Sequence, residues 1–556
     1  MWSTHQVENQ VDELSDYNPL ASDTALQEGL VRAGADWARP QLLGYGEILG
    51  RAETQALAEQ ANHHPPELQT HDRRGRRIEQ VDFHPSWHTL LALYRGQGLV
   101  SLPYDNERPG RWAAFAAGFY LHGQIEAGTL CPATMTQAAI PVLAREPLFE
   151  QLPGLRQGLL SRAHDPRDLP IAQKTGLWIG MGMTEKQGGS DVRANSTRAT
   201  PVAGAGRGAE YALRGHKWFF SAPMSDAHLV VAQTDDGPSC FFVPRWRPDG
   251  SRNTVQIQRL KDKVGNRSNS SAEVEFQDAY GLLLGEPGRG IPTIIEMATT
   301  TRLNCVIGST AIQRQALVQA LHYTRRRHAF GRPLAEQPLM RSVLLDLALE
   351  SEASVQLMLR LAQAFENHQD PSQRPWQRLM TPAAKFWVCK RAVELTGEAM
   401  EVFGGNGYVD PGPMARLYRE APVNSIWEGS GNVMCLDLLR AFAREPETAF
   451  ALLDELQALA GDEARLRQEL DALRSLLHGT PPDELEALGR RLAQRLVLLA
   501  QACLLRAQAP ATLAEAFVAS RYDAQGGRVY GALDARGLPV AALLERAYPG
   551  RWPRLS

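Results

Sequence analysis

The chain has 556 residues, of which 44% are apolar and 22% are charged, and its formal net charge is −3. This composition is that of a folded protein with a large core, and it excludes global disorder. A net charge so close to zero does not by itself indicate a highly charged partner. The excess of arginine over lysine, 52 to 7, is better explained by genomic codon bias than by nucleic-acid binding.

Cysteine usage and hydropathy favour a cytoplasmic protein without a membrane span. The six cysteines are far apart and form no C-x-x-C, which predicts reduced core residues rather than disulfides or a zinc site. The first residues, MWSTHQVENQVDELSDY, contain acids and no apolar core, unlike a signal peptide. No apolar run approaches the roughly 18 residues of a membrane span. We interpret HHPP at 63–66 as a surface turn, because no third metal ligand follows at helical spacing.

The periodicity of the chain predicts a mostly α protein with a central β-barrel-like domain. Residues 1–176 are mostly helical in pattern, and WAAFAAGFYLHGQIEAGTL at 112–130 is typical of a buried helix. Residues 177–290 contain short β-branched and aromatic segments between turns, and AEVEF at 272–276 alternates like a strand with one wet face. Helical periodicity returns over 291–445.

Residues 446–556 form a C-terminal extension that is rich in leucine, alanine, glutamate and arginine. Leucines recur at spacings of three, four and seven, which predicts two helices separated by the turn GTPPD, with Glu463 at a vacant seam position. We expect this stripe to pack on the body of the protein or on another subunit. The leucines are 452, 456, 459, 466, 470, 473 and 477, then 485, 488, 492, 496 and 499.

Glycine-rich stretches give weak signals when each is taken alone. GMGMTEKQGGSD at 180–191 ends a predicted strand in a loop whose backbone could approach a ligand closely, although a tight turn also needs glycine. It is not a Walker sequence. GAGRG at 204–208 precedes a strand and does not open a helix, so it is not a dinucleotide fingerprint.

Four motifs in a fixed order carry a stronger signal. GHKWFFSAP at 215–223 offers aromatic rings followed by a serine, and RRRHAFGRPL at 325–334 offers a basic cluster. EVFGGNGY at 401–408 ends a helix in close-packed glycines, and SIWEGSGN at 425–432 places one carboxylate between an indole and a glycine. Each could be structural on its own, but their order around a β domain points to one family.

In this order the motifs resemble the acyl-CoA dehydrogenase family, and within it the AidB-like branch of alkylation-response flavoproteins. MGMTEKQGGSD, SDAHLV, TPAAKF and MCLD also look like that branch. The resemblance covers nearly the whole chain and is weakest in the C-terminal extension. It implies a helical domain, a β domain and a four-helix bundle, followed by the extension.

The resemblance also implies bound FAD and a homotetramer, because Arg327 and its neighbours would reach the cofactor of another subunit. Ser190 and Arg302 would contact the acyl-CoA substrate. The residues implied to contact FAD are Met181, Met183, Thr184, Gly189, Ser190, Phe219, Ser221, Arg327, Phe330, Gly404, Gly405, Ile426, Ser430, Gly431 and Asn432.

Glu428 stands where most of the family has its catalytic base. The α-proton of an acyl thioester is a weak acid, so its removal needs a basic carboxylate and donors on the thioester oxygen. We expect Trp427 to raise the pKa of Glu428 by desolvation. Some relatives place the base before an arginine on a central helix, but here Thr301 precedes Arg302.

Two functions remain open, and they are compatible. One is acyl-CoA dehydrogenase chemistry on short or branched chains such as isovaleryl-CoA, and the other is protection of DNA from alkylation through binding of double-stranded DNA. The alternative is a conventional metabolic dehydrogenase without DNA binding. A nitroalkane oxidase is disfavoured, because that chemistry uses aspartate at the base position. Lys186, Gln187 and Trp427 depart from the common family pattern.

The candidate DNA contacts lie in the C-terminal extension. Residues 451–556 contain 13 arginines, no lysine and 13 acids, so a phosphate-binding face requires that these charges segregate. The competing interpretation is that the arginines pair with the acids that precede them. The candidates are Arg490, Arg491 and Arg495 on the second predicted helix, followed by Arg521, Arg528 and Arg536.

Overall fold

The computed structural model describes residues 3–522, 529–530, 532 and 535–550. It confirms a mostly helical protein with a central barrel-like sheet and a helical C-terminal region. Its contacts divide the chain into two compact units. Unit 1 comprises Met1–Gln55, Pro109–Ile125 and Cys305–Ser556, and unit 2 comprises Ala56–Arg108 and Glu126–Asn304. The segment predicted as one helical domain, residues 1–176, therefore contributes to both units.

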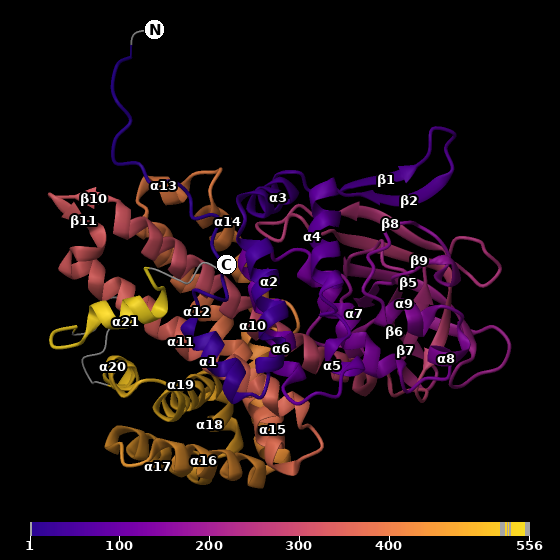
Figure 1. Ribbon diagram of the computed structural model, residues 1–556. Helices are drawn as coiled ribbons and strands as arrows, with labels where there is room; N and C mark the ends of the chain where they lie inside the picture. Colours follow the sequence, from indigo (N-terminus) through magenta and orange to yellow (C-terminus); the bar gives the residue numbers. More distant parts are fainter. Residues whose placement is uncertain (1–2, 523–528, 531, 533–534, 551–556) are drawn as a thin grey trace. The chain divides into compact units, whose positions relative to one another are not determined.

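Unit 2 is built around a seven-stranded sheet that closes on itself (Figure 1). The strand order is β3-β6-β4-β5-β9-β7, with β8 paired to β9, and pairing of β6 with β7 closes a ring of five strands. The strands are β3 (Ile179–Gly182), β4 (Arg198–Pro201), β5 (Glu210–Ser221), β6 (Ala227–Thr234), β7 (Gly237–Pro244), β8 (Val255–Leu260) and β9 (Ser271–Leu284).

The predicted alternation in β9 is confirmed, since Ala272, Val274 and Phe276 are buried in the barrel core and the glutamates between them are not. Closure of the sheet leaves few free strand edges and explains why so many short strands are stable together. Helices of unit 2 include most of α3 (Ala52–His63), α4 (Pro85–Gly96), α5 (Leu102–Asp105), α7 (Leu130–Leu143), α8 (Leu148–Gln151) and α9 (Leu155–Leu160).

A β-hairpin interrupts the region that the sequence pattern predicted as helical. Strands β1 (Glu67–His71) and β2 (Arg77–Asp82) follow directly on the turn at 63–66, and Leu68 and Val81 pack against the barrel core. Glu79 is buried, and its Oε2 accepts a hydrogen bond from the backbone N–H of Ile257 at 2.7 Å. The hairpin is therefore joined to β8 through the side chain of Glu79, a charged residue that the sequence alone would place on the surface.

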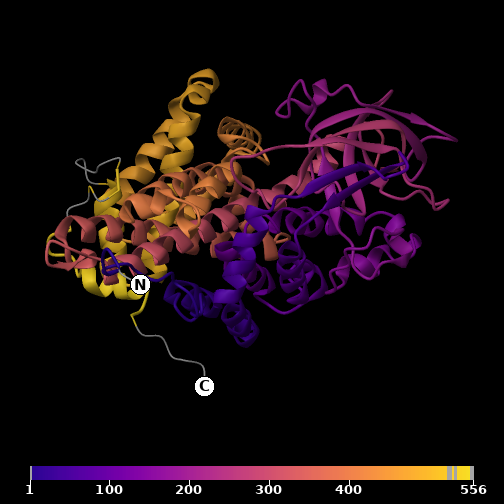
Figure 2. The ribbon, with the colours of Figure 1, turned by 90° about the horizontal axis from the view of Figure 1, so that it is seen from above.

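Unit 1 is helical and contains the long helices of the chain (Figure 2). Its central helices are buried on most faces, and the predicted helix at 112–130 is confirmed over α6, where Trp112 to Ile125 are all buried. Its helices include α1 (Thr24–Arg32), α2 (Arg39–Gly50), α6 (Arg111–Ile125), the later part of α10 (Gly290–Arg326), α11 (Pro338–Glu366), α12 (Thr381–Val402), α13 (Gly405–Tyr408), α14 (Pro413–Glu420) and α15 (Gly431–Arg444).

The C-terminal extension adds a second group of helices to unit 1 (Figure 1). Helices α16, α17 and α19 pack together, and most of the predicted leucine stripe is buried there. The prediction of a single helix before GTPPD was wrong, because Gly461 ends α16 at φ +59° and Glu463 caps α17. The helices are α16 (Pro446–Ala460), α17 (Ala464–Gly479), α18 (Pro482–Ala487), α19 (Gly489–Gln508), α20 (Ala511–Tyr522) and α21 (Val540–Ala547).

The six cysteines are buried free thiols, as predicted. Among the described residues, no cluster of three or more histidines, cysteines or acids could hold a metal ion, and no helix is long and apolar enough to cross a membrane.

Candidate active site

In unit 2, the glycine-rich loop leaves the end of β3 and folds back on β5. Met181 lies in β3, and the backbone N–H of Trp218 donates to the carbonyl of Thr184 at 2.8 Å. Asn195 Nδ2 donates to the carbonyl of Met183 at 2.8 Å. A Cβ on Gly189 would lie 2.5 Å from Thr184 Oγ1, so only glycine permits this close approach. The tip of the loop, including Ser190, is exposed.

A buried ion pair between the loop and β5 holds the loop in place. Lys217 Nζ donates to Glu185 Oε1 at 2.7 Å, and both side chains are fully buried. The other carboxylate oxygen accepts from the backbone N–H of Ser196 at 2.7 Å. Burial opposes ionisation of Glu185, but the Lys217 charge and these hydrogen bonds outweigh it and lower the pKa of Glu185 to about 2.

The end of β5 presents aromatic surface to solvent. Phe219 is 51% exposed, and Ser221 follows it at the last position of the strand. Lys261 Nζ lies 3.6 Å from the Trp218 ring centroid and 4.6 Å from that of Phe219. A cation over one face of these rings is a favourable arrangement that orients them. This strand end therefore offers flat apolar surface next to the glycine-rich loop after β3, which contains Thr184 and is called the Thr184 loop below.

The alternative base position on α10 holds no carboxylate, in agreement with the sequence. Thr301 is buried, and its hydroxyl donates to the carbonyl of Ala298 at 2.9 Å. Arg302, the predicted substrate contact, is half-buried in the next position of the helix.

In unit 1, Glu428 lies in a tight loop between a 3₁₀ turn, Ala421–Ser425, and α15. Its φ is +57°, which is unusual for a residue with a side chain, and Gly429 follows at φ +96°. Glu428 and Trp427 are half-buried, while Ile426 is 65% exposed. Strain of this kind costs on the order of 1 kcal/mol or more, and it persists only where surrounding contacts hold it.

The N-terminus of α15 carries three of the predicted cofactor residues. Ser430 is the residue before the helix, and Gly431 and Asn432 form its first turn. The unpaired backbone N–H groups of such a turn attract phosphate oxygens. Arg490 of α19 donates from Nη1 to Asn432 Oδ1 at 3.0 Å and lies over the Phe386 ring. A positive charge therefore stands beside this helix end.

Arg327 and Phe330 lie in a short hairpin formed by β10 (His328–Ala329) and β11 (Arg332–Pro333). Phe330 is 97% exposed with φ +53°, and Arg327 donates to the carbonyl of Asn9. The second predicted glycine pair, 404–405, opens α13 with empty space where each Cβ would be.

These residues fit FAD as a ligand. Three predicted cofactor contacts, Phe219, Phe330 and Ile426, are large apolar side chains that remain exposed in the chain alone. Exposed apolar surface is a feature of ligand-binding sites, and the backbone N–H groups of a helix N-terminus bind phosphate. A flavin with its diphosphate requires aromatic surface for its ring, glycines that permit close approach, and free backbone N–H groups that donate to its phosphates.

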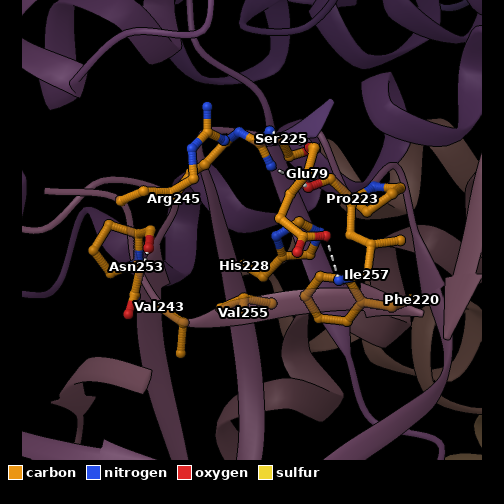
Figure 3. Close-up of a pocket in the computed structure, with 12 residues that line it drawn as sticks. Glu79, Phe220, Pro223, Ser225, His228, Val243, Arg245, Asn253, Val255 and Ile257 are labelled. Carbon is orange, nitrogen blue, oxygen red and sulfur yellow. Dashed lines mark hydrogen bonds between the residues drawn. The ribbon is translucent and has the colours of Figure 1, made fainter. Parts of the chain in front are cut away.

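A separate pocket lies at the end of the barrel in unit 2, where the hairpin residue Glu79 faces His228 and Phe220 (Figure 3). His228 is buried, which lowers its pKa to about 3 and keeps it neutral. None of the residues predicted to contact FAD lines this pocket. Phe220 points into it, whereas its neighbour Phe219 is exposed, so the pocket lies on the other face of β5.

The candidate DNA arginines are not a set of free cations. Arg495 donates twice to Glu469, and Arg521 is 12% exposed and donates to Asp346 and Glu350. Arg490, Arg491 and Arg536 are exposed, and Arg490 also donates to Asn432. Arg528 lies outside the described residues. The pairing of Arg495 follows the competing interpretation, in which the arginines neutralise earlier acids.

Lys385 and Asn424 are two residues near Glu428 that the sequence analysis did not select. Lys385 interrupts the apolar stretch TPAAKFWVC of α12 and is 1% exposed. A lone charge in a buried helical face was a signal for it. Asn424 carried no such signal, because asparagine is common in turns.

Comparison with known proteins identifies the family. The AidB N-terminal domain model matches residues 9–166, the acyl-CoA dehydrogenase middle domain matches 180–279, and the acyl-CoA dehydrogenase C-terminal domain matches 288–443. AidB of Escherichia coli (strain K12) is 46% identical over 531 residues, which cover 95% of this chain and 96% of that protein. The chain belongs to the acyl-CoA dehydrogenase family. Within it the chain is AidB-like, and membership makes it an FAD-dependent oxidoreductase.

Two solved structures share the fold of this acyl-CoA dehydrogenase family member over nearly its whole length. Bd2924 in its apo-form has a TM-score of 0.82 and 29% identity, and the match covers 90% of this chain and 99% of Bd2924. Caenorhabditis elegans ACDH-11, in complex with C11-CoA, has a TM-score of 0.83 and 24% identity, with 98% and 93% covered. The fold therefore includes the region after residue 443, where the domain models stop.

Proposed function

We propose that the protein oxidises an acyl-CoA thioester with Glu428 as the base. The observation that supports this most strongly is the backbone of Glu428, held at φ +57° in the loop that matches the family's base motif. Strained backbone at a residue with a reactive side chain often marks a functional site. The single carboxylate in SIWEGSGN is the one that the loop constrains.

In this proposal the Glu428 carboxylate takes the proton from the carbon next to the thioester carbonyl. FAD, when bound, supplies the acceptor for the hydride that leaves the β-carbon, and the product is the α,β-unsaturated thioester. Phe219, Ser221 and the Thr184 loop would hold the flavin ring. Ser430 and Asn432 would hold its phosphate end with the N–H groups of α15. Ser190 and Arg302 would contact the substrate.

The substrate that we propose is a short or branched acyl-CoA such as isovaleryl-CoA. Trp427 supports this choice, since its indole takes space beside Glu428 and is fixed by a hydrogen bond from Nε1 to Asn424 Oδ1 at 3.0 Å. The test is anaerobic titration of the flavin with a series of acyl-CoAs of increasing length and branching. Bleaching by short or branched chains is expected, and no bleaching by any of them would contradict the proposal.

We also propose that the protein protects DNA from alkylation by binding double-stranded DNA, acting in the cytoplasm. The support is its 46% identity with AidB rather than a basic surface. Arg490 and Arg491 remain as candidate phosphate contacts, because Arg495 and Arg521 are engaged in ion pairs. Fluorescence anisotropy with duplex DNA across a salt series, comparing wild type with Arg490→Ala/Arg491→Ala, tests this. Absence of binding at low salt would refute the proposal, and so would binding that neither salt nor the double substitution alters.

The homotetramer remains a proposal that the surface of unit 1 supports. Phe330, Leu339, Tyr408 and Val409 are 97%, 85%, 80% and 55% exposed. Large apolar side chains with this exposure are typical of surfaces that another subunit covers.

A further inference from the structure

Lys385 is a fully enclosed cation whose hydrogen bond ends on the Glu428 loop. It lies in α12 and is 1% exposed, and its Nζ donates to the carbonyl of Gly429 at 2.7 Å. A buried ammonium is unfavourable unless it is bonded, and a charge-assisted hydrogen bond is stronger and more directional than a neutral one. Gly429 is the residue directly after the proposed base.

The backbone at this point needs an external restraint. Glu428 and Gly429 both have positive φ, at +57° and +96°. A side chain on Gly429 would collide with the end of Met434. A loop of two consecutive left-handed residues relaxes readily when nothing fixes its carbonyls, because Glu428 has more favourable conformations elsewhere.

The other side of Glu428 is also tied to a helix. Trp427 Nε1 donates to Asn424 Oδ1 at 3.0 Å, and Asn424 Nδ2 donates to Ser309 Oγ of α10 at 3.2 Å. Asn424 and Ser309 are buried. Glu428 is therefore held between two anchors, a neutral one before it and the Lys385 cation after it.

The neighbours of Lys385 show that its charge acts in this region. Burial raises the pKa of the Cys305 and Cys389 thiols, so both remain neutral and neither compensates the ammonium. Lys385 and Glu428 act on the Cys305 thiol in opposite directions, which places both charges within electrostatic range of the same sulfur.

We propose that Lys385 is a positioning residue for Glu428: its hydrogen bond to the Gly429 carbonyl holds the loop in the strained conformation that aims the carboxylate. This rests on the proposed function for the role of Glu428 as base. The competing account is that Lys385 satisfies its own charge on the nearest carbonyl and contributes only to stability.

The test compares Lys385→Met with Arg360→Met as a matched control. Methionine keeps the apolar stem and removes the donor. Arg360 is a covered cation of unit 1 that bonds Glu455 and lies over Trp376, and neither of these partners belongs to the Glu428 loop. The readouts are hydrogen exchange of the peptide spanning 421–433, and the flavin reduction rate and dissociation constant for isovaleryl-CoA in anaerobic stopped flow.

We expect K385M to exchange at least tenfold faster over 421–433 and to reduce its flavin at least tenfold more slowly, with a dissociation constant within threefold of wild type. R360M should match wild type in all three. Wild-type exchange and reduction in K385M would overturn the proposal, as would equal losses in both variants. Lys385→Gln, which is shorter and uncharged, carries the same test if K385M does not fold. At least threefold changes are then expected, and wild-type values would overturn the proposal.

The two proposals fail in different ways. If no acyl-CoA reduces the wild-type flavin, the proposed function fails, and the exchange difference alone decides whether Lys385 holds the loop. If reduction is normal in K385M while Glu428→Gln abolishes it, the base assignment stands and the positioning role is wrong.

Discussion

Lys217 and Glu185 form an ion pair, 2.7 Å long, from which water is excluded on both sides. It joins β5 to the loop that follows β3, and both of its residues adjoin the hydrogen bond between Trp218 and Thr184, in the loop that is proposed to hold the flavin ring. Two charges in such a place are stable only as a bonded pair, so removal of one leaves the other buried and uncompensated.

Lys217→Met is therefore expected to lower the free energy of unfolding by about 3–5 kcal/mol, measured by denaturant unfolding. The control is Arg214→Ala in the same strand as Lys217, which removes an exposed ion pair with Asp278 of β9 and should change stability by less than about 1 kcal/mol. Equal effects of the two variants would show that the buried pair has no special role in stability.

The same pair predicts an acid-dependent loss of stability. The folded pKa of Glu185 is about 2 against an ordinary value of 4.5, so its ionised form stabilises the fold fully above pH 4.5. That contribution, of about 3 kcal/mol, is lost as the pH falls from 4.5 through 2. Unfolding free energies across this range should fall less steeply in Glu185→Gln than in wild type. Parallel curves would contradict this assignment.

Arg521→Ala is expected to affect the fold rather than contacts with DNA. Its guanidinium is covered and bonded to Asp346 and Glu350, so the change should lower the unfolding free energy by about 3 kcal/mol. Arg491→Ala, an exposed residue on α19, should leave stability within about 0.5 kcal/mol of wild type. A stable Arg521→Ala protein with weakened DNA binding would reverse our interpretation.

The local sequence pattern predicted much of the fold, because the helices and strands that it identified are determined by the residues within each element. The alternation in β9 and the apolar helix α6 are of this kind. The hairpin was missed because its strands are five and six residues long and carry charged side chains, and the one that is buried, Glu79, bonds to β8, which is far away in the sequence. Pairing of β6 with β7, which closes the barrel, is equally invisible in a local window.

The candidate site could be proposed from the sequence where a motif marks it, and not where interacting residues lie far apart in the chain. Glu428 stands out in its own octapeptide, but Lys385 is 44 residues from the carbonyl that it binds. Arg521 was a candidate DNA contact, and its acidic partners, which lie 171 and 175 residues away, could not be identified from the sequence. Whether a charged side chain is buried depends on its partners, and a single sequence does not show partners that lie far away in the chain.

Leu339→Asp is expected to shift the protein from the proposed homotetramer to smaller species. Leu339 is 85% exposed at the start of α11 and is not among the proposed cofactor contacts. Burial of a carboxylate in an apolar interface is strongly unfavourable. Sedimentation velocity at micromolar concentration measures the effect, with Val202→Asp, an exposed residue of unit 2, as control. A wild-type monomer under these conditions would exclude the tetramer.

Glu428→Gln tests the central claim most directly, in anaerobic single-turnover reduction of the bound flavin by isovaleryl-CoA. Glutamine preserves the shape of the loop and removes the basic oxygen, so the variant should bind FAD as wild type does and lose at least about a thousandfold in reduction rate, within the range of general base catalysis. A Glu428→Gln protein that binds FAD and reduces it at the wild-type rate would show that another residue takes the proton, and the account of this site would be wrong.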